Sequence, residues 1–281
     1  MNRRQRQAWL QDVRLAARLG HEAALDAALA GLLEEPAVAA NRPLPPDMVQ
    51  RVLVPGGQAL AAATVPEGYL RRLATAPYAA LRALAAAALA RRFAQGRATP
   101  QALEPLARDA RAEVHDALQA VLSTAPQPRL AALVRAWLTP RKPPRSPRAV
   151  ALAWELAPLA LPPSELWDQA ARWVRHEAFA ALEPAIVRAL LAAAKADPAL
   201  ALQQLRTGLA QRRWPPTLAA RVLGGPWAAA HAAEVLPLLR GLYARHGRRR
   251  WLTQALQALA RRGAIDDPEA VLRAWEQTPT P

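Results

Sequence analysis

The stretch PEGYLRRLATAPYAALRALAAAALARRFAQG, residues 66–96, decides the fold class. It consists of two runs rich in Ala, Leu and Arg, which are among the residues that favour a helix most strongly. Each run opens with a proline, and proline ends one helix or starts the next because it has no N–H and a fixed φ. The stretch therefore predicts two helices joined by a short turn.

The same arrangement recurs along the rest of the chain, which has 281 residues. No window shows the alternation of Val, Ile or Thr with polar residues that a half-buried strand requires, so the predicted fold class is all-α. The further predicted helix pairs lie at 99–110 with 111–125, 127–138 with 146–160, 162–173 with 174–196, 197–213 with 215–225, and 231–247 with 248–263.

The second helices carry apolar residues at positions i, i+4 and i+8, which lie on one face of a helix. The spacing occurs at Leu81-Ala85-Leu89, Val114-Leu118-Leu122, Ala149-Ala153-Ala157, Val174-Ala178-Leu182 and Trp251-Ala255-Leu259, with Leu218-Val222 as a weaker sixth member. The first members recur on average about every 34 positions, and one short interval followed by a long one indicates a shifted boundary. Such recurrence indicates a repeat protein. We expect burial of Leu89, Leu118, Leu122, Leu182, Leu256 and Leu259.

This period also fits tetratricopeptide repeats, but their signature needs Trp, Gly and aromatic residues at fixed offsets, and Gly and Tyr do not recur in this way here. The units instead resemble short HEAT repeats, whose second helix often opens with an acid, followed later by an apolar residue and a basic one. Asp109 before Val114-His115 and Asp168 before Val174-Arg175 match this shape, and Leu81-Arg82 matches its second half.

The resemblance implies a right-handed α-solenoid of about six HEAT-like helical hairpins in one continuous superhelical arc. Residues 1–65 would form an N-terminal helical cap with a Pro-rich loop at 36–46. The repeats would occupy 66–263, and a capping helix with a tail would occupy 264–281. Two glycine pairs beside proline, Gly56-Gly57 and Gly224-Gly225, are expected in turns, and the first pair is expected to interrupt a helix that begins near Asp47.

The chain carries a large positive charge, with 37 Lys plus Arg against 22 Asp plus Glu and a net charge of +15. An excess of this size attracts polyanions over a long range, and nucleic acid is the commonest polyanion. A genome rich in G and C explains the preference for Arg over Lys, but it does not explain the excess over acids.

The sequence argues against several kinds of catalytic, metal-binding and phosphate-binding site. Cysteine is absent, which excludes disulfides, thiolate metal sites and a Cys nucleophile. The five histidines form no H-E-x-x-H motif, the serines at 123, 146 and 164 lie in no G-x-S-x-G frame, and there is no glycine-rich phosphate loop. We therefore predict no catalytic residues, no metal ligands and no cofactor. No long uncharged apolar stretch or signal-peptide core is present, so the expected location is cytoplasmic, without a membrane.

Basic clusters are the predicted nucleic-acid-binding residues. Four cations fall in one interhelical turn at 141–148, and Arg248-Arg249-Arg250 open a helix, where cations oppose the helix dipole and suggest an external anion. The complete predicted set is Arg82, Arg141, Lys142, Arg145, Arg148, Arg172, Arg175, Arg248, Arg249 and Arg250. Trp173, between two arginines, is equally suited to base stacking or to the core, whereas Trp137, Trp154 and Trp251 are expected in the core.

Two stretches, Trp173 to Ala178 and the run from Trp251 through Pro268 to Val271, resemble the bacterial alkylpurine DNA glycosylases of the HEAT-repeat type. The resemblance implies that helical repeats cradle a duplex and that an Asp beside Trp residues acts at the damaged nucleotide. The sequence departs from this pattern, because the helix at 146–160 that should carry the Asp has only Trp154-Glu155.

Asp168, near Trp167 and Trp173, is the one Asp in a Trp-rich setting. Its offset before Val174 fits the structural Asp of a HEAT turn, so its carboxylate is expected to accept hydrogen bonds from backbone N–H groups at a hairpin turn. Three functions stay open. The first is a non-enzymatic protein that binds the backbone phosphates of DNA or RNA. The second is a scaffold for an acidic protein partner, and the third is a glycosylase-like repair enzyme.

Overall fold

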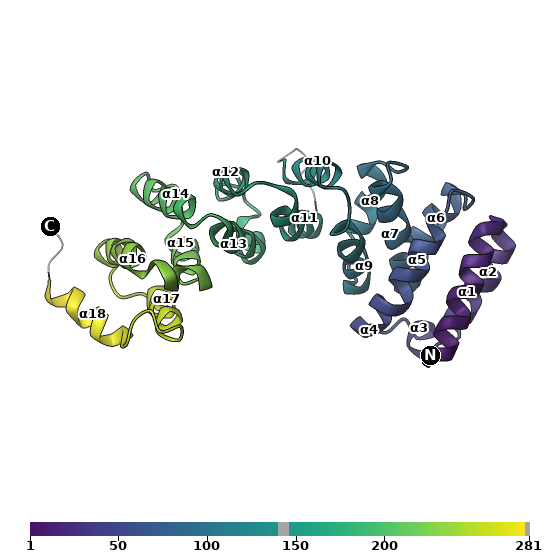
Figure 1. Ribbon diagram of the computed structural model, residues 1–281, viewed down its shortest axis with the longest axis horizontal. Helices are drawn as coiled ribbons and strands as arrows, with labels where there is room; N and C mark the ends of the chain where they lie inside the picture. The colour runs from purple at the N-terminus through teal and green to yellow at the C-terminus, as the bar shows by residue number, and fades with distance from the viewer. Residues whose placement is uncertain (140–145, 279–281) are drawn as a thin grey trace. The chain divides into compact units, whose positions relative to one another are not determined.

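A computed structural model describes residues 1–139 and 146–278, and every regular element in this part of the chain is a helix (Figure 1). The prediction of an all-α fold is therefore confirmed. Contacts group the chain into two compact units, Met1–Ala160 and Leu161–Pro281, which we call the N-terminal and the C-terminal unit. Within the same described ranges, no helix has both the length and the apolar character needed to cross a membrane.

The N-terminal unit contains the predicted cap and the first predicted repeats. Its elements are α1 (Arg3–Leu19), α2 (Glu22–Leu33), α3 (Pro36–Ala39), α4 (Pro46–Met48), a π-helical turn η1 (Val49–Leu53), α5 (Val54–Leu60), α6 (Glu67–Ala74), α7 (Ala79–Ala94), α8 (Pro100–Ala107), α9 (Ala112–Leu122), α10 (Gln127–Leu138) and α11 (Pro147–Ala160). The predicted loop at 36–46 thus begins with a helical turn, because proline is well suited to a first helical position.

The C-terminal unit begins after Ala160. Its elements are α12 (Pro163–Trp173), α13 (Phe179–Ala196), α14 (Pro198–Ala210), α15 (Pro216–Leu223), a 3-10 turn η2 (Pro226–His231), α16 (Ala232–His246), α17 (Arg250–Ala260) and α18 (Pro268–Gln277). The boundary between the units falls inside the predicted repeat segment 66–263. The division into cap, repeats and capping helix stays a prediction.

Helices that are neighbours in the sequence pack as pairs, from α6 with α7 to α16 with α17. Within each unit the pairs also pack on one another. In the N-terminal unit α7 packs on α5 and α9, and in the C-terminal unit α15 packs on α13 and α17 while α14 packs on α12 and α16 (Figure 1). This is the local arrangement expected of stacked hairpins. The continuous arc of about six HEAT-like hairpins stays a prediction.

One helix start differs from the prediction. The predicted helix at 174–196 begins only at Phe179, because residues 174–178 form a turn in which the amide of Ala178 donates to Nδ1 of His176 at 3.1 Å. The buried face of this helix starts at Leu182 and continues through Ile186 and Leu190. If the apolar spacing of this helix is counted from Leu182 instead of Val174, the second helices recur at nearly equal intervals along the sequence. The unequal intervals in the sequence pattern therefore arise from the turn at 174–178.

The core consists mainly of Leu, Ala and Trp. All six leucines expected in the core are buried, which confirms that prediction. Trp137 and Trp154 are buried as expected, and Trp251 is half-buried. Trp173 is also buried, so it does not offer an exposed face for base stacking.

The expected interruption at Pro55-Gly56-Gly57 is wrong, since the chain stays helical from Pro46 to Leu60. Pro55 has no N–H for the usual bond four residues back, and the helix widens into a π turn in which the amide of Val54 bonds to the carbonyl of Val49. The glycines lie on the face of α5 that packs on α7. The pair Gly224-Gly225 does follow the end of α15, as expected.

Candidate nucleic-acid interface

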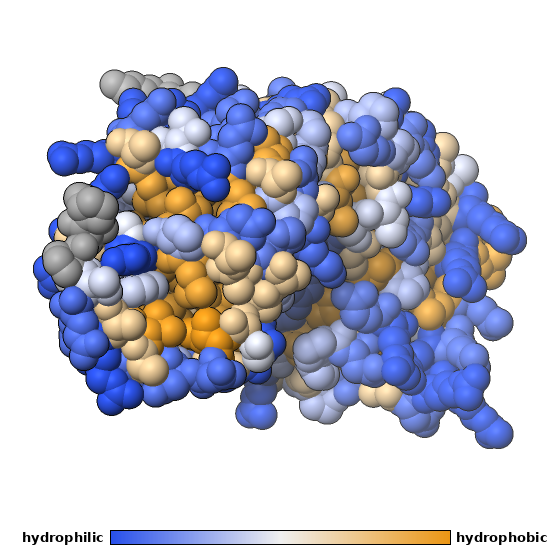
Figure 2. Space-filling view, turned by 60° about the vertical axis from the view of Figure 1, so that its left-hand side comes forward, coloured by the Kyte–Doolittle hydropathy of each residue, from blue (hydrophilic) through white to orange (hydrophobic). Residues whose placement is uncertain are grey.

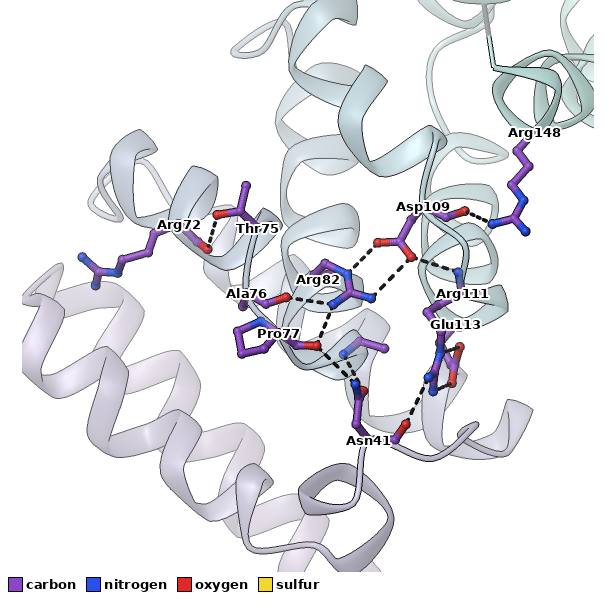
Figure 3. Close-up of polar contacts among 11 residues, drawn as sticks. Asn41, Arg72, Thr75, Ala76, Pro77, Arg82, Asp109, Arg111, Glu113 and Arg148 are labelled. Atoms are coloured by element: carbon purple, nitrogen blue, oxygen red, sulfur yellow. Dashed lines mark hydrogen bonds and ion pairs between the residues drawn. The ribbon is translucent and has the colours of Figure 1, made fainter.

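Arg82, near the start of α7, has its hydrogen-bonding groups directed into the protein (Figure 3). Its Nε donates to Oδ2 of Asp109 at 2.6 Å, and its Nη1 donates to the carbonyls of Ala76 and Pro77 at 2.8 and 2.9 Å. Only 18% of the side chain is exposed. Arg82 therefore joins two interhelical turns of the N-terminal unit, and its role as a nucleic-acid contact stays a prediction.

Asp109 is the centre of this network (Figure 3). Its carboxylate also accepts a hydrogen bond from the amide of Arg111 at 2.9 Å, which fixes the turn before α9. Burial alone would raise the pKa of Asp109, but the hydrogen bonds from Arg82 and Arg111 and the charge of Arg82 outweigh burial and lower this pKa. Asp109 thus accepts a backbone hydrogen bond at an interhelical turn, which is the kind of contact expected of Asp168.

A third segment joins the network through Arg111, whose Nη1 donates to the carbonyl of Asn41 at 3.0 Å. The side chain of Arg111 also pairs with the buried Glu113 at 3.0 Å, and the amide of Leu44 donates to the same carboxylate at 2.8 Å. Charged side chains, which in the sequence look like exposed surface residues, therefore hold together the interhelical segments near residues 41–44, 76–77 and 109–111.

The lowered pKa of Asp109 predicts a loss of stability in acid. A lowered folded-state pKa means that the stabilisation is present above the ordinary Asp pKa of about 3.9 and is lost as pH falls through the folded-state value. Asp109→Asn should reduce the free energy of unfolding by about 2 kcal/mol at neutral pH and flatten its decline toward pH 3. The measurement is chemical denaturation of the full chain across this range.

Asp116, in the neighbouring turn of α9, is the matched control. Burial, aided by the charge of Glu113, raises the pKa of Asp116, so its ionised form destabilises the fold. A carboxyl group whose pKa is raised in the folded state stabilises the fold at pH values below its ordinary pKa, and this stabilisation is lost as the pH rises. Asp116→Asn should therefore raise stability at neutral pH and steepen the decline in acid. Equal pH profiles for the two variants would contradict the assigned network.

Arg148 is the remaining candidate of the N-terminal unit that lies within the described residues, and its surroundings are of mixed charge. Arg148 is exposed and donates to the carbonyl of Asp109 at 3.0 Å. It lines a cavity of about 340 Å³ together with His115 and the carboxyl groups of Asp116 and Glu155, so cations and acids are mixed there. Arg141, Lys142 and Arg145 lie outside the described residues.

The predicted cluster at the start of α17 is partly engaged. Arg248 forms an ion pair with Glu269 of α18 at 2.6 Å, and Nε of Arg249 donates to the carbonyl of His246 at 2.9 Å. Arg250 is exposed, as is Arg172 on α12. The side chains of Arg250 and Arg172 are therefore accessible to a ligand.

Asp168 does not occupy a hairpin turn, and that prediction is wrong. It lies in the middle of α12 on the exposed side, and the hydrogen bonds of the described residues include none to its carboxylate. Trp167 and Trp173 are buried, with the ring of Trp167 packed edge-on against Trp214 at 5.5 Å. The Asp and Trp side chains therefore do not converge on a cavity as the glycosylase resemblance requires.

Four arginines of the C-terminal unit line a cavity of about 640 Å³. The cavity opens at the carboxyl ends of α12, α14 and α16, three first helices that pack side by side. The arginines that line it, which we call the groove arginines, are Arg175, Arg212, Arg213 and Arg245. We call the cavity the basic groove.

The sequence around α14 explains the shape of the groove. The chain turns sharply after α14, where the amide of Arg213 donates to the carbonyl of Gly208 at 2.7 Å and Arg212 adopts a positive φ of 53°. Trp214 then folds back on α14, and its indole N–H donates to the carbonyl of Gln204 at 3.0 Å. A Cβ at Gly208 would overlap Nε1 of Trp214, so only glycine leaves room for the indole.

The floor of the groove is apolar and its rim is basic. Leu209, Trp214 and Leu242 are buried, whereas the groove arginines and His246 are exposed. Arg245 anchors the rim, because its Nη1 donates to the carbonyl of Leu209 at 2.8 Å. Among the described residues, no acidic side chain lines the groove or forms an ion pair with its arginines. The groove thus combines apolar contact with a local excess of positive charge.

Only Arg175 of the groove arginines belongs to the predicted set. Arg212, Arg213 and Arg245 lie outside that set. A signal was present, because Arg175, Arg212 and Arg245 follow one another at intervals close to the repeat period. Cations at the same place in successive repeats come to one edge when the repeats stack.

Within residues 1–139 and 146–278, no three His, Asp or Glu side chains come together in a way that could hold a metal ion. Comparison of the chain with protein-family models, curated proteins and solved structures gives no match. The function is therefore argued from the chemistry of the basic groove.

Proposed function

We propose that this chain is a non-enzymatic, HEAT-like helical-repeat protein that binds nucleic acid through backbone phosphates at the basic groove. The observation that carries the proposal is the convergence of four arginines on one cavity without an acidic lining residue. The planar guanidinium group donates two parallel hydrogen bonds to a phosphate, which makes Arg the side chain best suited to this ligand.

The contrast with the N-terminal unit supports an external anion. There, Arg72 pairs with Glu22, Arg82 with Asp109, and Arg111 with Glu113. The groove arginines have no such acidic partner among the described residues. Cations at helix carboxyl ends are favoured by the helix dipole, but that interaction amounts to roughly 0.3–1 kcal/mol per group and leaves most of each charge available.

The backbone of Arg212 supports the same conclusion. Its φ is positive, in the left-handed region that glycine tolerates and that other residues rarely adopt. An arginine at this position is not explained by local stability. Strained positions often serve a ligand, and Arg212 lies on the rim of the groove.

The repeat spacing supports the HEAT-like part of the proposal. Second helices recur at nearly equal intervals once the start of α13 is corrected, and neighbouring pairs stack within each unit. Arg172 and Arg250 are proposed as flanking phosphate contacts. An acidic protein partner is the second candidate, favoured by the apolar floor of the groove. The geometry of Asp168 gives no reason to propose glycosylase activity.

The proposal predicts a steep dependence of nucleic-acid binding on salt. Each phosphate neutralised contributes about −0.9 to the slope of log affinity against log salt on duplex DNA and about −0.7 on a single strand. The double variant Arg175→Glu with Arg213→Glu removes two phosphate contacts. It should therefore make the slope less negative by about two of these per-phosphate contributions and leave helicity unchanged. Fluorescence anisotropy with labelled DNA and RNA over a range of salt concentrations measures this effect.

Arg4 and Arg14, exposed on α1, provide the matched control. Arg4→Glu with Arg14→Glu changes the net charge by the same amount but leaves the groove intact, and should weaken binding only slightly through the long-range field. The proposal fails if the two double variants weaken binding equally. An acidic protein partner is indicated instead if the wild-type chain binds nucleic acid weakly and the groove variant does not alter that binding.

A further inference from the structure

We infer that the basic groove receives unpaired nucleotides, so that single-stranded nucleic acid is its preferred ligand. This inference rests on the proposed function, since it assumes that the groove arginines bind phosphate. It adds a role for the apolar interior of the groove. Phosphate binding alone requires exposed cations, and it does not explain a cavity of about 640 Å³ between them.

The size and lining of the groove match one nucleotide. Sites for small organic ligands have volumes of about 300–1,000 Å³ and are mostly apolar with a few polar groups at the rim. In the groove, Leu209 and Leu242 belong to the apolar floor, Pro215 adds apolar surface, and the arginines stand at the edge. In a duplex the bases are stacked inside and only the backbone is presented, so the apolar interior of the groove would stay without a partner. A single strand can turn a base into the cavity.

A second hollow continues the first one. It has a volume of about 220 Å³, lies between α14 and α16, and shares Leu209, Leu242 and Arg245 with the basic groove. Its own lining includes Leu238 and Arg206. Figure 2 shows apolar side chains at the surface between hydrophilic ones on the side of the molecule that is turned forward.

The arginines that line the two hollows are distributed in a way that suits a single nucleic-acid strand. Arg245 borders both hollows, and Arg206 lines the second one but not the first. Each base in a hollow would then be flanked by phosphates that meet an arginine on either side. An acidic helical peptide needs a groove that is apolar along its whole length, whereas arginines line both of these connected hollows, which fits a chain of flat rings and phosphates better.

The groove offers stacking surfaces other than tryptophan. Trp214 forms part of the floor, with its indole N–H engaged by Gln204. His246 is exposed at the rim, and arginine guanidinium planes also stack on bases. No amide or carboxyl side chain lines either hollow among the described residues, so base edges have few specific partners and sequence preference should be slight.

Gly241 allows a test that keeps the protein folded. It lies in α16, lines the second hollow, and a Cβ there would meet no atom within 4 Å. Gly241→Leu should fill the hollow without a clash and should raise helix propensity. The matched control is Gly68→Leu in α6, because a Cβ at Gly68 also meets nothing within 4 Å and this residue lines neither hollow.

The experiment compares an oligothymidine of about 15 nucleotides, a duplex of the same length, and an acidic amphipathic peptide, each with wild type, Gly241→Leu and Gly68→Leu at one salt concentration. We expect wild type to bind the single strand about tenfold more tightly than the duplex, since stacking contributes roughly 1–3 kcal/mol per base. Gly241→Leu should remove most of this preference and leave duplex binding unchanged. Gly68→Leu should behave as wild type.

Two other outcomes separate the inference from the function on which it rests. Equal binding of single strand and duplex, weakened by Arg175→Glu with Arg213→Glu but not by Gly241→Leu, would overturn the inference and leave phosphate binding intact. Binding of the acidic peptide, with no binding of either nucleic acid, would overturn both.

Discussion

Replacing Arg92 by methionine is expected to lower the free energy of unfolding of the N-terminal unit by about 3 kcal/mol. Arg92 belongs to the pair Arg91-Arg92, which has the sequence pattern of an exposed basic patch, yet it is only 6% exposed. Its guanidinium group donates to the carbonyls of Ala61, Ala62 and Val65 at 3.3, 2.6 and 2.6 Å, beyond the end of α5. Methionine would keep the apolar stem but take from the carbonyl of Val65 the donor that Arg92 provides, and an unsatisfied buried acceptor costs about 1–3 kcal/mol. The carbonyls of Ala61 and Ala62 would each lose one hydrogen bond and keep those from Arg97 and from the amide of Val65.

Arg91→Met is the matched control for this prediction. Arg91 is the preceding residue of the same helix and is exposed, so the same chemical change should alter stability by no more than about 0.5 kcal/mol. Chemical denaturation of the full chain measures both variants, and hydrogen exchange in peptides from α5 and α7 locates the loss. If the two variants are equally stable, the assignment of Arg92 to the fold is wrong.

The sequence predicted the features that depend on local periodicity. An amphipathic helix shows its buried face at i, i+4 and i+8 whatever it packs against, and so Leu89, Leu118 and Leu182 could be placed in the core. The prolines marked most helix starts for the same local reason. The start of α13 could not be predicted in this way, because the turn at 174–178 depends on a contact between the ring of His176 and the backbone.

The candidate site could be predicted only in part, because the partner of a charged side chain is set by tertiary structure. Arg82 and Arg175 have the same appearance in the sequence, each beside an apolar residue near a helix end. The first lies 2.6 Å from the carboxylate of Asp109, and the second lines the groove without an acid. The groove also depends on residues from three helix ends, which stacking brings together and which no short motif contains.

Glycine gave the most misleading signal, because it favours turns locally but also occurs inside helices where two helices pack closely. A glycine pair after proline usually indicates a turn. At Gly56-Gly57 the pair instead allows two helices to approach. A Cβ at Gly56 would lie 2.7 Å from the ring of Trp9 and 2.9 Å from Leu84, which is too close for any larger residue without a shift of the helix.

Gly57→Ala is therefore expected to destabilise the N-terminal unit by about 2 kcal/mol, even though Ala favours a helix over Gly by about 1 kcal/mol. The new Cβ would lie 2.5 Å from the Cβ of Ala87 and 2.5 Å from the carbonyl oxygen of Leu84, so backbone atoms of α7 must move. Gly68→Ala, in the open position of α6, should instead stabilise the unit by up to about 1 kcal/mol. Chemical denaturation of both variants against wild type measures the difference. The close contact of α5 with α7 requires that the two substitutions change the free energy of unfolding in opposite directions. If both substitutions stabilise the protein, the two helices are not packed as closely as the distance of 2.5 Å indicates.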